Sequence, residues 1–177
     1  MRYCTLVVAL AGSLLLTGCA GLISLNPIVT GQEARLDPAL LGVWHDNDGE
    51  DTLIVKRAGD HYAITYVDKS SPSTLKFEAR LLEVGDAKLL DVVSSEDDPF
   101  QIAAHVPMRV WPEGLTLRIS FLDSDWLKQQ ARQQLAVQTT KDRTLITAPS
   151  DEVRTFLMKY GVDAKAYGEP QVLNKAQ

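Results

Sequence analysis

The sequence is poor in cysteine. Its 177 residues include two, Cys4 and Cys19, and both lie near the N-terminus. Two cysteines allow at most one disulfide, whereas small disulfide-rich scaffolds use several in a short chain. We therefore expect the protein to be stabilised by a hydrophobic core, which a single domain of this length is large enough to form.

The N-terminal apolar stretch is too short to cross a membrane. It runs over residues 6–16, whereas a transmembrane helix needs about 20 apolar residues. Arg2 precedes it and is the only charged residue before it. A basic residue followed by a short apolar segment is typical of a secretory signal peptide.

The four residues Leu16-Thr17-Gly18-Cys19 follow this stretch directly. They resemble the lipobox of bacterial lipoprotein signals, in which Leu and two small residues precede a modified Cys. The resemblance implies that residues 1–18 are cleaved off and that Cys19 is lipidated on its sulfur and its new amine. Two or three acyl chains hold a protein firmly on a membrane. The alternative is a plain secretory signal that happens to precede a Cys.

Residue Ala20 bears on the location of such a lipoprotein. In Gram-negative envelopes an Asp at this position favours retention in the inner membrane, so Ala20 implies an outer-membrane lipoprotein facing the periplasm. Cleavage before Cys19 would also remove Cys4, so the mature chain would contain no internal disulfide.

Positive charge is scarce as well. The formal net charge is −5, and removal of Arg2 with the signal makes it one unit more negative. An acidic domain repels phosphates, which disfavours a nucleic-acid partner. No polybasic cluster is present in the sequence to bind a membrane surface, so the acyl chains on Cys19 would provide the membrane attachment.

Recognisable catalytic and metal-binding motifs are missing. The sequence has no Gly-x-Ser-x-Gly elbow and no glycine-rich phosphate loop. His45, His61 and His105 are far apart and lack zinc-ligand spacing. The acidic stretch 46–51 places glycine at the wrong position for a calcium loop and is better explained as a solvated turn. We expect no cofactor, no metal and no enzymatic activity.

Residues 19–36 show no sustained periodicity and are interpreted as a tether, which leaves residues 37–177 as one folded domain. Within that domain apolar residues alternate with polar ones, the pattern of strands that bury one face. Short turns separate the segments. The pattern predicts strands at residues 51–57, 61–67, 75–81, 88–93, 102–111, 115–122, 137–140, 144–147 and 170–173.

Two helices are expected late in the chain. The first covers Ser124 to about Leu135, and Asp123 or Ser124 is suited to cap it. The second lies between Ser150 and Gly161, because Val153, Phe156 and Leu157 recur at helical spacing.

The segment Gly42-Val43-Trp44 resembles the Gly-x-Trp signature of lipocalins and the wider calycin group. The resemblance implies a mainly β, antiparallel barrel of the lipocalin-like kind, with Gly42 and Trp44 at its closed end. In that family an Arg late in the chain commonly lies beside the Trp, and Arg143 is the nearest candidate by position. The family's usual motif in the turn after the sixth strand is missing. An open sheet or a sandwich is the alternative fold.

Aromatic residues form the candidate binding site. Tyr62, Tyr66 and Phe77 share one face of the early strands, and Trp111 and Phe121 lie on later strands. They would either line a pocket for a hydrophobic or lipid-like molecule or fill the interior of the barrel. The sequence therefore leaves two functions open: a lipoprotein that binds such a ligand, and an envelope lipoprotein that engages another protein.

Overall fold

The computed structural model describes residues 22–71, 74–95, 102–131, 134–140 and 143–176. The predicted signal peptide and the predicted lipidation site Cys19 lie outside these ranges. Within them the chain is mainly β with two α-helices near the C-terminus, as predicted. No helix in this described part is long and apolar enough to cross a membrane.

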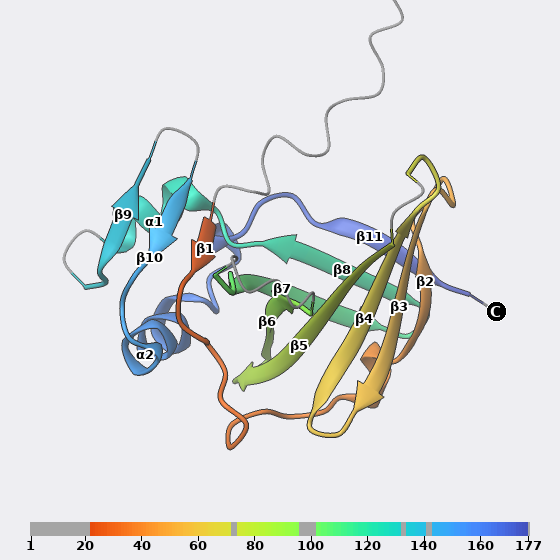
Figure 1. Cartoon of the computed structure of the whole chain (residues 1–177), viewed down its shortest axis with the longest axis horizontal. Coiled ribbons are helices and arrows are strands. Elements are labelled where there is room, and N and C mark those ends of the chain that lie inside the picture. The colour runs from red at the N-terminus through yellow and green to blue at the C-terminus, as the bar shows by residue number, and fades with distance from the viewer. Residues whose placement is uncertain (1–21, 72–73, 96–101, 132–133, 141–142, 177) are drawn as a thin grey trace, which may run out of the picture.

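Eight antiparallel strands close into a barrel, which decides against the open sheet and the sandwich (Figure 1). Strand β11 lies between β8 and β2 and closes the ring. The strands are β2 (Gly42–His45), β3 (Asp51–Ala58), β4 (His61–Asp68), β5 (Thr74–Val84), β6 (Ala87–Ser94), β7 (Val106–Glu113), β8 (Thr116–Phe121) and β11 (Gln171–Lys175). Strand β7 begins four residues later than residue 102, the predicted start, and Ile102 is exposed.

The predicted alternation builds the interior of the barrel. Tyr62 and Ile64 of β4 face inward, and so do Ala79 and Leu81 of β5. The buried residues of this inner core are Leu40, Trp44, Val55, Tyr62, Ile64, Ala79, Leu81, Leu90, Val92, Val110, Leu117 and Leu173. A barrel of about eight strands is just wide enough for side chains to fill, and here the inward-facing side chains form one buried cluster.

One end of the barrel is closed by the short helix η2 (Pro38–Leu40). Trp44 is fully buried beneath it and donates a hydrogen bond from Nε1 to the Leu40 carbonyl oxygen, at 3.0 Å. Gly42 has a positive φ of 143°, and a Cβ there would lie 2.7 Å from Cε of Lys175. The ammonium of Lys175 lies 4.9 Å from the centre of the Trp44 ring.

Lys175, and not Arg143, is therefore the cation beside Trp44. Arg143 lies in the turn between two strands outside the barrel, where its backbone carbonyl accepts a hydrogen bond from Thr140. The prediction for Arg143 was wrong because the last barrel strand is β11, which follows both helices.

A second layer packs against the outside of the barrel. It contains the three-stranded sheet β1 (Leu22–Ser24), β10 (Thr144–Ile146) and β9 (Val137–Thr139), the helices α1 (Ser124–Ala131) and α2 (Ser150–Tyr160), and the short helix η3 (Ala164–Ala166). Leu82 and Leu89 on the outer wall of the barrel join Leu127, Phe156 and Leu157 in a second core. Figure 1 shows this layer on the left of the barrel.

The segment predicted to be a tether is part of the fold from Leu22 onward. Strand β1 pairs in parallel with β10, so that Leu22 lies opposite Thr144. Ile28 and Val29 are 1% and 2% exposed. The prediction was wrong for residues 22–36, because their apolar residues are buried against strands far away in sequence, and no local periodicity reports such contacts.

Candidate functional site

The aromatic residues predicted to line a pocket lie in three different places. Tyr62 is in the inner core with 1% exposure. Tyr66 and Phe77 are half-buried toward the end of the barrel that carries the β2–β3, β4–β5 and β6–β7 loops. Phe121, the last residue of β8, shares the inward face of Leu117 and Ile119. Trp111 lies elsewhere.

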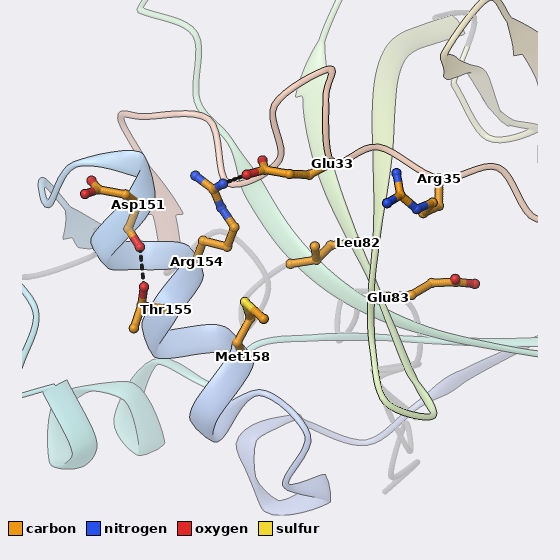
Figure 2. A pocket seen from close by; sticks show the side chains of 8 residues that line it. All are labelled: Glu33, Arg35, Leu82, Glu83, Asp151, Arg154, Thr155 and Met158. Carbon is orange, nitrogen blue, oxygen red and sulfur yellow. Dashed lines mark hydrogen bonds and ion pairs between the residues drawn. The ribbon is translucent and has the colours of Figure 1, made fainter.

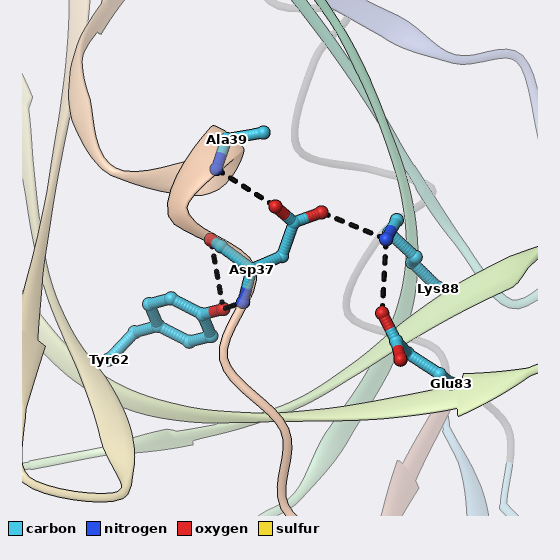
Figure 3. Close-up of polar contacts among 5 residues, drawn as sticks. All are labelled: Asp37, Ala39, Tyr62, Glu83 and Lys88. Carbon is cyan, nitrogen blue, oxygen red and sulfur yellow. Dashed lines mark hydrogen bonds and ion pairs between the residues drawn. The ribbon is translucent and has the colours of Figure 1, made fainter.

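Tyr62 is part of a polar cluster at the closed end of the barrel (Figure 3). Its hydroxyl accepts a hydrogen bond from the Asp37 backbone N–H at 2.6 Å and donates to the Asp37 carbonyl oxygen at 3.3 Å. The Asp37 carboxylate accepts from the backbone N–H of Ala39 and pairs with the Lys88 ammonium at 2.8 Å. Lys88 also pairs with Glu83 at 3.1 Å.

The electrostatics of this cluster stabilise the charged forms of Asp37 and Lys88. Burial disfavours the ionised form of Asp37, but hydrogen bonds from Lys88 and Ala39 outweigh it and place the pKa of Asp37 below its ordinary value. Hydrogen bonds to the carboxylates of Asp37 and Glu83 raise the pKa of Lys88. Burial raises the pKa of Tyr62, so its hydroxyl stays neutral. The cluster fixes η2 over the end of the barrel, and the Tyr62 hydroxyl is already hydrogen-bonded within it.

Trp111 faces the outside of the barrel, so its assignment to an interior pocket was wrong. On β7 the residues Met108 and Val110 point into the inner core, and the alternation places Arg109 and Trp111 on the opposite face. The guanidinium carbons of Arg109 and Arg118 lie 4.8 and 5.4 Å from the centre of the Trp111 ring. The Tyr167 ring packs edge-on against Trp111, with 6.3 Å between ring centres.

Apolar side chains extend this outer surface. Val172 of β11 is paired in register with Arg118 and is 37% exposed. Val162, which follows α2, is 44% exposed, and its carbonyl oxygen accepts a hydrogen bond from Arg109 at 2.9 Å. We call Arg109, Trp111, Arg118, Val162 and Val172 the Trp111 patch.

The Trp111 patch combines an aromatic ring, two guanidinium groups and exposed apolar side chains. Trp and Arg are the residues most enriched among the energetically dominant contacts of interfaces. A planar guanidinium stacked on an indole is held in place, so it loses little freedom when it binds a carboxylate. Glu113 pairs with Arg118 at the edge of the patch, whereas Arg109 forms no ion pair with a carboxylate of the described residues.

A groove of about 540 Å³ lies outside the barrel, between α2, strand β5 and the segment after β1. Figure 2 shows that its floor is formed by Leu82 and Met158 and its walls by charged residues. An ion pair between Arg154 and Glu33 joins two of these walls. Because its walls carry both signs of charge, the groove lacks the apolar lining expected for a hydrophobic ligand.

A buried polar network was missed at the sequence level. Asp91 on β6 is 4% exposed and pairs with Nδ1 of His105 at 2.9 Å. Its other oxygen accepts hydrogen bonds from the backbone N–H groups of Ile28 and Val29, at 2.8 and 3.1 Å. The signal was available, since Asp91 is the single charged residue in the run Leu89-Leu90-Asp91-Val92-Val93.

The described ranges contain no group of three or more His, Cys, Asp or Glu side chains placed to hold a metal ion. Comparison with protein-family models, with curated proteins and with solved structures gives no match to this chain. The fold alone defines the class of the molecule: a closed, eight-stranded antiparallel barrel with a cluster of buried apolar residues inside it and an external layer.

Proposed function

We propose that this protein is a membrane-anchored lipoprotein of the bacterial envelope that acts by engaging another envelope protein through the Trp111 patch. The anchor is the acylated Cys19 implied by the lipobox. The observation that carries the interaction is the position of Trp111 on the outer wall, between Arg109 and Arg118. The burial of the inner-core side chains against one another supports surface recognition over enclosure of a small molecule.

The residues of the Trp111 patch also indicate the chemistry of the partner surface. Arg109 favours a carboxylate, while Trp111, Val162 and Val172 favour apolar side chains. In a chain with a net charge of −5, a local basic surface steers an acidic region of a partner toward itself. The expected partner surface therefore presents Asp or Glu beside an apolar residue.

Site-specific photo-crosslinking tests this proposal in intact cells. A photoreactive amino acid at Val172 reports on the patch, and one at Lys56 is the matched control, since Lys56 is exposed on the outer wall at β3. We expect one discrete adduct from position 172, none from position 56, and at least a tenfold loss of adduct when Trp111→Ala is added, because a hot-spot residue contributes about 2 kcal/mol or more. An adduct that is insensitive to Trp111→Ala, or no adduct, contradicts the proposal.

The anchor has its own test. Cys19→Ala removes the thiol that would be acylated, so we expect loss of metabolic labelling by a fatty-acid analogue and accumulation of the uncleaved precursor. Ala20→Asp is the matched variant that keeps the thiol. Continued lipid labelling of the Cys19→Ala protein would refute the anchor.

Binding of a hydrophobic or lipid-like molecule is the second candidate function. It is favoured by the half-buried Tyr66, Phe77 and Phe121 near the loop end of the barrel. Burial, and next to it a hydrogen bond with the Asp51 carboxylate, raise the pKa of Tyr66 and keep its hydroxyl neutral. Native mass spectrometry of protein purified from its own host tests this candidate. A co-purifying lipid supports it, whereas empty protein that binds no fatty-acid probe counts against it.

A further inference from the structure

Strand β1 holds the start of the described chain firmly against the body of the protein. Leu22 is 4% exposed and Ser24 is fully buried. The backbones of Ser24 and His105 exchange two hydrogen bonds, of 2.7 and 2.9 Å, and Leu25 donates to the Ile146 carbonyl oxygen at 3.0 Å. The position of Leu22 is therefore fixed relative to the barrel.

The proposed acylation site is three residues before Leu22. Consecutive Cα atoms are 3.8 Å apart, so the Cα atoms of Cys19 and Leu22 are separated by at most about 11 Å, whatever path residues 20 and 21 take. A lipid-anchored Cys19 lies at the headgroup level of the bilayer. A leash this short keeps Leu22, and the part of the domain around it, at the membrane surface.

The membrane therefore lies next to the end of the three-stranded sheet at which β1 begins. Strands β1 and β10 are parallel, so the start of β10 lies beside Leu22 (Figure 1). The turn that leads into β10 is closed by hydrogen bonds between Thr140 and Arg143. Thr139, Thr140 and Arg143 are exposed, and they match a headgroup layer of phosphates and hydroxyls. A single Arg near an anionic bilayer is attracted to its negative surface.

We infer that the end of the sheet that carries Thr139, Thr140 and Arg143 rests against phospholipid headgroups, and that the domain stands on the membrane in one orientation. This inference depends on the anchor in the proposed function. The turn at Gly59 and Asp60, between β3 and β4, lies on the opposite side of the molecule in Figure 1 and points away from the bilayer. The domain then reaches partners in or near its own membrane.

The test uses the full acylated protein in vesicles of phosphatidylethanolamine and phosphatidylglycerol. Cleavage removes Cys4 and acylation consumes the sulfur of Cys19, so an introduced cysteine is the only free thiol. One variant, Thr139→Cys, labels the proposed membrane face, and a second, Asp60→Cys, is the matched control. Energy transfer from each dye to a headgroup-labelled lipid measures its height above the bilayer. We expect transfer from position 139 to be several-fold stronger than from position 60.

A variant with a flexible insert tests whether the short connection between Cys19 and Leu22 causes the orientation. Twenty Gly and Ser residues placed between Gly21 and Leu22 have a root-mean-square reach of about 25 Å, and we expect them to bring the two signals to similar values. Vesicle-bound protein with equal transfer at both positions before the insert is added overturns the inference alone. Protein that does not float with the vesicles overturns the inference together with the proposed anchor.

Discussion

The carboxylate of Asp91 lies 2.9 Å from Nδ1 of His105, and both side chains are buried between the barrel and the segment that follows β1. The backbone of His105 is hydrogen-bonded to Ser24, and the second oxygen of Asp91 accepts from the N–H groups of Ile28 and Val29. One charged group on β6 therefore holds two separate parts of the chain. It fixes the N-terminal segment on the outer wall of the barrel.

The first prediction concerns this network. Asp91→Ala leaves two buried N–H groups and an imidazole without their acceptor, so we expect a loss of about 3–5 kcal/mol in the free energy of unfolding. Asp91→Asn keeps one acceptor oxygen and should cost less, about 1–3 kcal/mol. Urea denaturation of the mature chain measures both losses.

The same variants should release the N-terminal segment. We expect faster tryptic cleavage after Arg35, whose backbone N–H is bonded to the Leu81 carbonyl oxygen in the intact fold. Asp86→Asn, in the exposed β5–β6 turn, is the control and should stay within about 0.5 kcal/mol of the wild type. Equal stability of Asp91→Ala and Asp86→Asn would show that the network does not hold the segment.

The second prediction concerns pH and the pair of Asp37 and Lys88. Because the pKa of Asp37 is below its ordinary value of 3.8, its ionised form stabilises the fold above that value, and the contribution is lost as the pH falls through the lowered pKa. Lys88→Met removes the cation, and we expect a cost of about 1–3 kcal/mol at neutral pH, since it breaks hydrogen bonds to charged groups.

The difference between the Lys88→Met protein and the wild type should shrink in acid, because protonated Asp37 no longer needs the ammonium. It should also shrink above the ordinary Lys value of 10.5, as the pH rises through the raised pKa of Lys88. Denaturation curves across this pH range measure it. Lys76→Met, at an exposed position on β5, is the control. A stability difference between Lys88→Met and the wild type that is constant from acid to alkali would argue against a stabilising Asp37–Lys88 pair.

The third prediction concerns Gly42 and Lys175. Lys175→Ala removes a cation from the face of Trp44 and should cost about 1 kcal/mol. Gly42→Ala adds a Cβ close to the Lys175 chain at a backbone angle that favours glycine, and should cost more. In the double variant the clash is relieved, so the summed single losses should exceed the measured loss. Thermal unfolding of the four proteins gives this coupling, and strict additivity would contradict the contact.

The closed barrel could be predicted because its strands show a local alternation of inward-facing and outward-facing residues in the sequence. On β5, Phe77, Ala79 and Leu81 alternate with charged residues, which fixes the face that this strand buries. The same alternation on β7 groups Trp111 with Arg109 and opposite Val110. The position of Trp111 on the outer wall was therefore readable, and was missed because the aromatic residues were grouped by type.

The packing of residues 22–36 could not be read in this way. Leu22 and Ile28 are buried by partners more than 60 residues away, such as Asp91 on β6 and Thr144 on β10. The cation beside Trp44 has the same origin, since Lys175 arrives on a strand that follows both helices. Contacts of this range depend on how the elements assemble, and a single sequence carries no periodic signal for them.

The last prediction tests whether the inner core is filled, on which the choice between the two functions depends. Leu81 is fully buried among the inner-core residues, so Leu81→Ala should cost about 2–5 kcal/mol and leave a cavity. Leu75→Ala removes the same atoms from a side chain that is 43% exposed and should cost much less. Urea denaturation compares the two. We also expect the Leu81→Ala protein to bind a benzene-sized probe, and the wild type to bind neither it nor a fatty-acid probe, because only the variant offers new apolar space of that size. A cost below about 1 kcal/mol at Leu81, together with tight probe binding by the wild type, would mean that the barrel holds a ligand, and the Trp111 patch would no longer be needed to explain its function.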